Sequence, residues 1–395
     1  MKKTTLTFVS VCALFSAGLT HIGYSETFSE AFAKAKAAGL AEFSYNGNLY
    51  TTQTAEEAAK LTYGPFPITL KGYSGSKTNS VSYTGQIARH VLHDSLKKLA
   101  AKGSKDDMMS YYNGSDLNLA IVAPKSKDGF PVKQTTLNDI SKGKNLSGKT
   151  YKGTMNAWPG QMTGKEALEF MINKAATVKG GVDTSTGYNY PQLISKFAMG
   201  AVFYNQAVDN YLDEKLSADN KPNSKPYKDG AYYTGKEHSW DEAFGYWGAA
   251  AHAMKLSPKE NYEITKMKNL KAADANGDGV VDLKSEMQFA HAYYASSFDK
   301  GGKTNYLHTV TRAFIDGRQV ITSANGNDLT DSQRDKLYEL AETIGSNWEK
   351  VIAESVFKYA GSVYKDINKL KELLDSNSDT TEAFATYAKH WGELK

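Results

Sequence analysis

The stretch YPQLISKFAMGAVFYNQAVDNYLDE, residues 190–214, decides the fold class, because its apolar residues recur every three or four positions. Pro191 stands in the first turn, where its fixed φ angle and missing N–H suit the start of a helix. The same period is found at 83–102, 163–178, 239–254, 286–298, 306–323, 330–370 and 381–393. Gly345 or Gly361 is expected to break the long 330–370 segment. The sequence therefore predicts an all-α, multi-helix bundle.

A small separate unit is predicted before the bundle, at 26–62. Residues 26–40 have the pattern of a short amphipathic helix that stops at Gly39. In the following stretch, EFSYNGNLYTT at 42–52, Asn46-Gly47 lies between alternating aromatic and polar residues, which is a strong signal for a β-hairpin. A Gly-, Pro- and Ser-rich connection then leads to a helical domain that we place at 80–395.

The N-terminus has the layout of a secretory signal peptide. In MKKTTLTFVSVCALFSAGLTHIGYSE, two lysines precede an apolar run of roughly ten residues and then small and polar residues. We place the signal peptide at 1–25, with cleavage after Ser25. The run is too short to span a bilayer, and no later segment is apolar enough to be a transmembrane segment of the mature chain. The expected location is therefore the cell envelope, in the periplasm, or outside the cell.

The composition and the motifs argue against several classes of protein. Cys12 is the only cysteine, so the mature chain would be held together by core burial and not by disulfides. The 47 Lys and Arg residues nearly balance the 43 Asp and Glu residues, which argues against a nucleic-acid-binding protein. The sequence has no HExxH, G-x-S-x-G, phosphate-loop or dinucleotide signature. Carboxylates are numerous enough to leave a glycosidase open, but nothing places two of them at the required separation, so binding is favoured over catalysis.

The stretch DANGDGVVDLKSE, residues 274–286, predicts a calcium site. Oxygen-bearing side chains at alternate positions, followed by a glycine, let a tight loop turn its oxygens towards one hard cation. The stretch resembles an EF-hand or dockerin-type loop, with the ligands Asp274, Asn276, Asp278, the Val280 carbonyl, Asp282 and Glu286. Position twelve of that pattern is Ser285, so either the loop is one residue longer or its coordination shell is short. An acidic turn that caps the next helix is the alternative.

A second candidate metal site is the stretch GKEHSWDEAFGYWG, residues 235–248. At helical spacing it offers nitrogen and oxygen ligands from Glu237, His238, Asp241 and Glu242. Such ligands suit iron, zinc or another transition metal, and the pair His90 and His93 in another predicted helix could complete the site. The alternative is a hydrogen-bonded network at a helix start, where carboxylates are favoured in any case.

Residues 112–160 are rich in Gly, Lys, Ser, Asn and Pro. A run of this length without clear helical period is unusual inside a compact domain. We interpret it as a functional or covering loop.

Four blocks of the chain resemble the bacterial family catalogued as domain of unknown function 4856: SYTGQIARHVLHDSLKKL (82–99), YPQLISKFAMGAVFYNQAVDNYL (190–212), EHSWDEAFGYWG (237–248) and YAGSVYKDINKL (359–370). The resemblance covers about 80–395, in the order of the family's blocks. That family is similar to the imelysin-like helical proteins of bacterial envelopes, which implies an imelysin-like bundle. Many imelysin-like proteins carry a Gly-x-His-x-x-Glu motif and are linked to iron uptake. Here His238 has Asp241 at the third position, with Glu242 beside it, so the motif is matched only in part.

Two functions follow from these observations. The first is an exported helical binding protein with a calcium loop that assists iron uptake at the envelope, binding a metal ion or metal complex and meeting an outer-membrane receptor. The second is a polysaccharide- or protein-binding envelope protein in which calcium is purely structural and exposed aromatic rings contact the ligand. A hydrolase is implied only by the peptidase for which the imelysin family was first named.

Overall fold

The structure of the chain is a computed structural model that describes residues 26–40, 42–52, 57, 61–114, 118–156 and 160–395. It divides the chain into two compact units, Met1–Ala58 and Ala59–Lys395. The signal peptide predicted at 1–25 lies outside the described residues. No helix in the described part of the chain combines the length and the hydropathy of a membrane-spanning segment.

In the part that the structure describes, the smaller unit contains one helix and one hairpin. Helix α2 (Phe28–Ala37) begins with a capping box, in which the Thr27 hydroxyl accepts the Glu30 N–H and the Glu30 carboxylate accepts the Thr27 N–H. Strands β1 (Glu42–Tyr45) and β2 (Asn48–Thr51) pair in antiparallel register. Asn46 and Gly47 join them with φ angles of 48° and 78°. Two successive positive φ angles are typical of a type I′ turn, so the predicted hairpin is confirmed.

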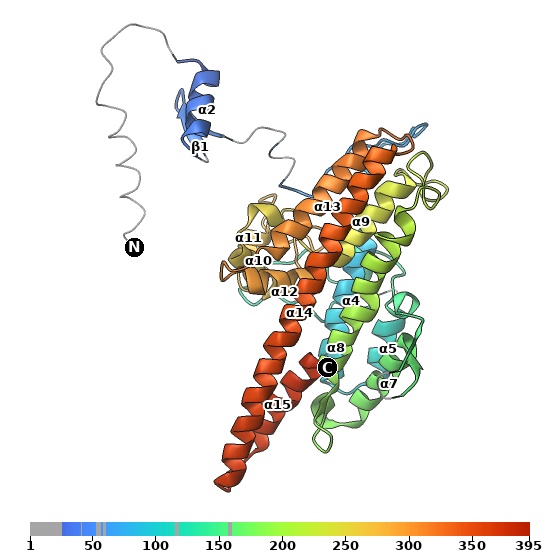
Figure 1. Cartoon of the computed structure of the whole chain (residues 1–395), viewed down its shortest axis with the longest axis vertical. Coiled ribbons are helices and arrows are strands. Elements are labelled where there is room, and N and C mark those ends of the chain that lie inside the picture. Colours follow the sequence, from blue (N-terminus) through green and yellow to red (C-terminus); the bar gives the residue numbers. More distant parts are fainter. Residues whose placement is uncertain (1–25, 41, 53–56, 58–60, 115–117, 157–159) are drawn as a thin grey trace, which may run out of the picture. The chain divides into compact units, whose positions relative to one another are not determined.

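The larger unit is built almost entirely of helices, which confirms the predicted all-α class (Figure 1). Its α-helices are α4 (Thr84–Ala100), α5 (Lys105–Asn113), α6 (Leu137–Ile140), α7 (Gly164–Thr177), α8 (Tyr190–Ala198), α9 (Gly235–Trp247), α10 (Pro258–Thr265), α11 (Leu270–Ala273), α12 (Ala290–Asp299), α13 (Tyr306–Ser323), α14 (Asp331–Asp375) and α15 (Thr381–Leu394). Short 3₁₀ turns lie at Ser147–Lys149, Lys179–Gly181, Glu214–Leu216 and Ala253–Lys255. Two-residue strands form the antiparallel pairs β3 (Thr154–Met155) with β4 (Met162–Thr163) and β5 (Val182–Asp183) with β6 (Tyr188–Asn189).

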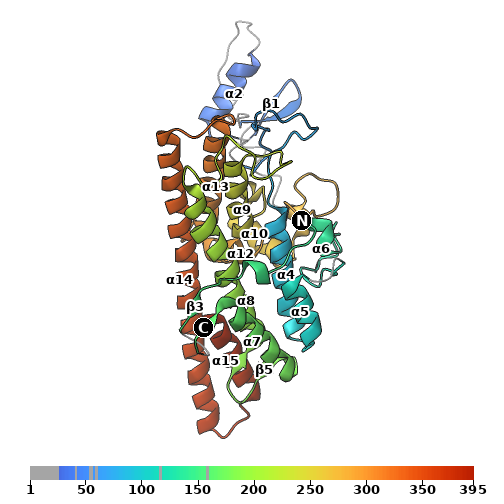
Figure 2. The ribbon, with the colours of Figure 1, turned by 90° about the vertical axis from the view of Figure 1, so that its right-hand side faces the viewer.

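Helix α14 is 45 residues long and organises the C-terminal part of the unit. Helix α13 packs beside its N-terminal half, and α15 folds back against its C-terminal half (Figures 1 and 2). The predicted break at Gly345 or Gly361 is wrong, because α14 runs through both positions. A glycine inside a helix costs only about 1 kcal/mol relative to alanine, which the packing of so long a helix outweighs.

The second half of the 190–214 segment differs from the predicted α-helix. Residues Met199–Tyr211 form a π-helix, which we call η3, directly after α8. π-helical segments are rare and are frequently found at functional sites, because the wider turn displaces side chains that an α-helix would align. The sequence period does not distinguish the two helix types over so short a stretch.

Two predicted helix boundaries also differ from the structure. The helix predicted at 239–254 is α9, which begins at Gly235 because Thr234 and Glu237 form a capping box. It ends before Gly248, whose φ of 82° is the left-handed conformation usual after a helix C-terminus. The helix predicted at 286–298 begins only at Ala290, because the acidic loop extends to Glu286.

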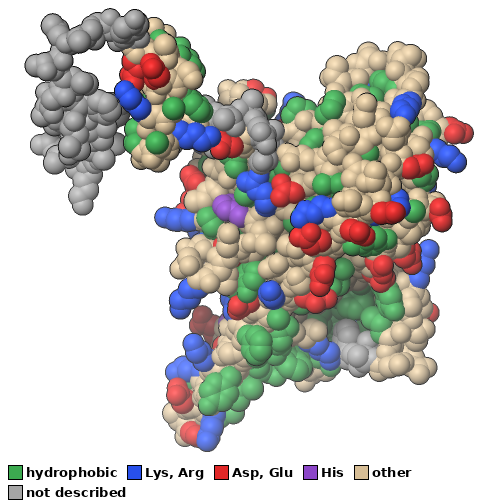
Figure 3. Space-filling view, turned by 45° about the horizontal axis from the view of Figure 1, so that its top comes forward, with side chains coloured by type: hydrophobic (Ala, Val, Ile, Leu, Met, Phe, Trp, Pro, Cys, Tyr) green, Lys and Arg blue, Asp and Glu red, His purple; other side chains and the backbone are tan. Residues whose placement is uncertain are grey.

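Most of the large aromatic side chains of α9 and its neighbours are buried. Trp240, Trp247 and Phe244 of α9 are each at most 1% exposed, and the ring of Tyr63 stacks on Phe244 with 3.7 Å between the centroids. Exposed large apolar side chains gather instead on the C-terminal half of α14, at the lower end of the molecule in Figure 3. They include Phe357, Tyr364, Ile367 and Leu374.

Candidate functional site

The four candidate ligands on α9 lie on two different faces of the helix. Glu237 and Asp241 face α13, where the guanidinium of Arg318 pairs with both: Nη1 lies 3.1 Å from Glu237 Oε1, and Nε lies 3.0 Å from Asp241 Oδ1. All three side chains are fully removed from solvent. An intact buried charge needs such partners, because its desolvation is otherwise very costly.

The remaining oxygens of these two carboxylates are also occupied. Tyr63 donates its hydroxyl to Asp241 Oδ1 at 2.7 Å, and the Ser82 N–H donates to Asp241 Oδ2 at 2.9 Å. The Thr69 hydroxyl and the Thr234 N–H donate to the two oxygens of Glu237. Glu237 and Asp241 thus belong to a hydrogen-bonded network at a helix start, which is the alternative stated for them above, and the structure does not bring them together with His238 and Glu242.

His238 and Glu242 form the other face of α9, with 3.8 Å between His238 Nε2 and Glu242 Oε1. The imidazole stacks on the ring of Tyr233 and meets the ring of Tyr227 edge-on, with 4.3 Å between centroids in each case. Burial lowers the pKa of His238 to about 4, so the ring is neutral at physiological pH. Lys215 and Lys228 also lower this pKa. The Glu242 carboxylate raises the pKa of His238 more than either lysine lowers it. The transition-metal assignment stays a prediction.

The two histidines of α4 serve a different purpose. His90 Nε2 lies 3.0 Å from the Gly245 carbonyl on α9, and His93 Nε2 lies 3.0 Å from the Ser195 carbonyl on α8. Both side chains are buried and join helices. Across the residues that the structure describes, no group of three or more His, Cys, Asp or Glu side chains is arranged to hold a metal ion.

The acidic loop at 274–286 is organised around the carboxylate of Asp274. Its two oxygens accept the N–H groups of Gly277, Asp278 and Gly279 at 2.8–3.1 Å. Gly277 and Gly279 have φ angles of 72° and 84°, so the chain bends there as the calcium-loop pattern requires. In this conformation the loop oxygens face the loop's own backbone.

Glu286 closes the loop although it stands at position thirteen. Its carboxylate accepts the Ala275 N–H at 3.1 Å and the Asp282 N–H at 2.7 Å, and its side chain is 4% exposed. Burial raises the pKa of Glu286 above its ordinary value, and the charges of Asp274 and Asp282 raise it further. The negative charges of Asp274 and Asp282 therefore disfavour the ionised form of Glu286. The calcium site stays a prediction.

The segment predicted as a covering loop packs against this acidic loop. The backbone of Val281 pairs with that of Pro131 and Lys133, with N–H···O distances of 2.9 Å. The Gln134 amide donates to Asp282 and accepts the N–H of Leu283. Residues 131–134 of this segment thus hold the acidic loop in place.

A cavity of about 700 Å³ lies between α8, η3, α12, α14 and α15. Its wall is mostly apolar and includes Met155, Met171, Leu193, Phe197, Met199, Ile352, Val356 and Leu394. Small residues of the π-helix, Gly200 and Ala201, leave part of the wall open. Volumes of 300–1,000 Å³ with predominantly apolar walls are usual for small-molecule sites.

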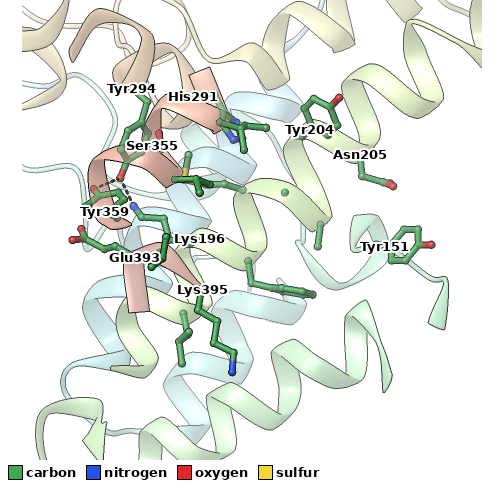
Figure 4. Close-up of a pocket in the computed structure, with 18 of the residues that line it drawn as sticks. Tyr151, Lys196, Tyr204, Asn205, His291, Tyr294, Ser355, Tyr359, Glu393 and Lys395 are labelled. Atoms are coloured by element: carbon green, nitrogen blue, oxygen red, sulfur yellow. Dashed lines mark hydrogen bonds between the residues drawn. The ribbon is translucent and has the colours of Figure 1, made fainter. Parts of the chain in front are cut away.

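The polar groups of the cavity come from helices far apart in the sequence (Figure 4). Lys196 of α8 donates to the Tyr294 hydroxyl of α12, which lies 3.2 Å from the Tyr359 hydroxyl of α14. His291 of α12 is 5% exposed and its Nδ1 atom has no hydrogen-bond partner. Burial lowers the pKa of His291 well below its ordinary value, so the ring is neutral. Glu393 of α15 also lines the cavity.

Nothing in the sequence analysis identified these cavity residues. Lys196, His291 and Tyr359 lie in segments that differ little from any other amphipathic helix, and only the packing of α8, α12, α14 and α15 brings them together. The available signal was weak: the 190–214 segment carries a lysine among apolar positions of its helical face.

Comparison with protein families gives a match, whereas searches of curated proteins and of solved structures give none. The match is to the family described as Domain of unknown function (DUF4856), over residues 173–335. This range contains η3, α9, α12, α13 and the acidic loop. The imelysin-like architecture stays a prediction. Over residues 173–335 the chain is therefore similar to the family described as Domain of unknown function (DUF4856).

Proposed function

We propose that this chain is an exported binding protein that takes a small ligand into the cavity between α8, η3, α12, α14 and α15. The cavity is the observation that supports this best, because it combines a volume of about 700 Å³ with an apolar wall and a few polar groups. The π-helix along one wall adds support, since such segments are concentrated at functional sites.

Binding is proposed in preference to catalysis because the cavity lacks an activated nucleophile among the described residues. Its hydroxyl group on α14, Ser355, donates to the Val351 carbonyl at 2.9 Å, as serines inside helices commonly do. An activated serine would instead donate to a base such as histidine. Tyr294 and Tyr359 are hydrogen-bonded to each other and are both 6% exposed. Burial raises the pKa of each hydroxyl, so both stay protonated.

The acidic loop has a structural role in this proposal: it holds a calcium ion that stabilises the packing of residues 131–134 on residues 281–283. Support comes from the bend at Gly277 and Gly279 and from the closeness of Glu286 to Asp274 and Asp282. The ligands would be those predicted from the sequence, with Glu286 supplying its carboxylate from position thirteen. Iron uptake, a receptor partner and polysaccharide binding stay predictions.

A neutral apolar fluorophore tests the cavity. N-phenyl-1-naphthylamine, titrated into the purified mature protein, is expected to bind at one site. Gly200→Phe places a ring in the cavity wall, so it should weaken binding of the fluorophore at least tenfold. The fold should be undisturbed, because a Cβ added at Gly200 meets nothing within 4 Å. Gly361→Phe is the matched control, because Gly361 is also a helix glycine with open space and lies outside the cavity wall. Absence of binding, or equal weakening by both variants, would contradict the proposed function.

A further inference from the structure

The polar end of the cavity is formed by a lysine that has no carboxylate partner. None of the ion pairs among the described residues involves Lys196. Its ammonium group donates to the Tyr294 hydroxyl and lies 4.6 Å from the centroid of the Tyr294 ring and 5.9 Å from that of Tyr359. Aromatic faces stabilise an ammonium ion only in part, and two of its three N–H groups remain available.

The surroundings of Lys196 carry more positive than negative charge. Lysines approach this end of the cavity from α4, α14, α15 and the end of α10, whereas the nearby carboxylates are those of Asp94 and Glu393. These lysines are Lys97, Lys266, Lys358 and Lys389. Burial lowers the pKa of Lys196 to about 8 and that of Lys97 to about 7; Glu393 and Asp94 raise both pKa values, and neighbouring lysines lower both. A bound anion would relieve the repulsion among the lysines.

His291 supplies a second, independent group for a ligand. Its ring is 95% buried, lines the cavity, and has an Nδ1 atom without a partner (Figure 4). Buried polar atoms without partners are uncommon in native proteins, because leaving one unpaired costs about 1–3 kcal/mol. A neutral imidazole in the cavity wall can donate a hydrogen bond to a ligand oxygen without adding a charge of its own.

The other wall of the cavity suits an apolar group of variable shape. Met155, Met171 and Met199 line it together with Phe197, Ile352 and Val356. Methionine side chains are flexible and polarisable, so they adapt to apolar ligands that rigid side chains would exclude. A sugar would leave its hydroxyl groups unpaired against such a wall, and a metal cation would be repelled by the lysines.

From these features we infer that the ligand is an amphipathic anion, with a carboxylate or phosphate head group bound by Lys196 and His291 and an apolar body along the methionine-lined wall. This inference rests on the proposed function of the cavity and adds the chemistry of its ligand. Glu393 lies at the same end and limits the site to one anionic group, since a second anionic group would meet its carboxylate.

Competition against bound N-phenyl-1-naphthylamine tests the inference with probes of one chain length. Dodecanoate and dodecyl phosphate carry the two candidate head groups, dodecanol is the neutral match, and dodecyltrimethylammonium is the cationic one. At neutral pH one of the two anions is expected to displace the fluorophore at a concentration at least tenfold lower than dodecanol, and the cation at a higher concentration than dodecanol. The better anion identifies the head group.

Three variants separate charge from shape. Lys196→Met keeps the length of the side chain and should abolish the preference for the anion over dodecanol. Lys196→Arg keeps the charge and should retain the preference for the anion. Glu393→Gln should leave this preference unchanged or increase it. Equal displacement by dodecanoate, dodecyl phosphate and dodecanol in the parent would overturn the inference while the cavity function stands. Failure of the fluorophore to bind would instead overturn the proposed function itself.

Discussion

Arg318 and Asp241 lie 77 positions apart in the chain and form an ion pair with 3.0 Å between Nε and Oδ1, with neither side chain exposed to solvent. Together with Glu237, this pair joins α13 to the first turns of α9. An intact buried ion pair adds little net stability, because the desolvation of its charges offsets their attraction. Loss of one partner is different, since it leaves the other charge buried and unpaired.

Arg318→Met should therefore lower the free energy of unfolding by about 3–5 kcal/mol. Urea denaturation of the purified variant measures this change. Lys336→Met is the matched control, because Lys336 pairs with Glu339 on the surface of α14 and exposed pairs contribute about 1 kcal/mol or less. Similar small losses in both variants would show that the buried network does not hold the two helices together.

Two glycines should respond to alanine in opposite directions. At Gly248, φ is 82° and a Cβ would lie 3.0 Å from the Phe289 carbonyl oxygen and 3.1 Å from His90 Nε2, so Gly248→Ala should destabilise the fold by about 1–2 kcal/mol or more. Gly361 lies inside α14 with no atom near its Cβ position, so Gly361→Ala should stabilise the fold by about 0.5–1 kcal/mol. Thermal and urea unfolding of both variants decide the signs, and a stabilised Gly248→Ala would refute the left-handed C-cap.

Calcium should raise the melting temperature of the mature protein, and a chelator should reverse the effect. Asp274→Asn keeps an oxygen that can accept the loop N–H groups but removes one charge. It should therefore reduce the calcium-dependent shift in melting temperature more than it lowers the melting temperature measured in chelator. Asp183→Asn, at the end of β5 and outside the loop, should leave the shift intact. If the melting curve of the parent protein is the same with calcium and with chelator, the loop is only an acidic turn and not a calcium site.

Anion binding in the cavity should weaken as the pH rises through about 8, the pKa to which burial lowers the ammonium of Lys196. Below that value the lysine is charged and attracts the anion; above it the attraction is lost. The groups that set this pKa are Glu393 and Lys389 on α15, Asp94 on α4, and Lys266. A bound anion raises the pKa again, so the midpoint should move upward as the anion concentration increases.

Competition by dodecanoate, measured from about pH 6 to about pH 10, gives the profile. The Lys196→Arg variant should keep its affinity for dodecanoate across this pH range, because a guanidinium keeps its proton at still higher pH. A parent profile without a decline, or a decline of the same size in Lys196→Arg, would exclude Lys196 as the group that binds the anion.

Local chemistry in the sequence determined much of the secondary structure. Asn46-Gly47 predicted the hairpin because few other residues accept two positive φ angles in succession, and Pro191 marked the start of α8. The apolar period predicted the all-α class. The true start of α9 was also encoded, in the capping box of Thr234 and Glu237, but the polar first turn concealed it from a search for apolar spacing.

Only the tertiary structure decided which polar side chains meet. The sequence placed Glu237, His238, Asp241 and Glu242 together on one short stretch, yet Arg318 of α13 pairs with Glu237 and Asp241, while His238 and Glu242 lie beside each other on another face. It gave no sign that η3 is a π-helix or that Lys196 and His291 line one cavity. Helical spacing reports which residues share a face of their own helix, whereas long-range packing, which has no period in the sequence, determines what that face meets.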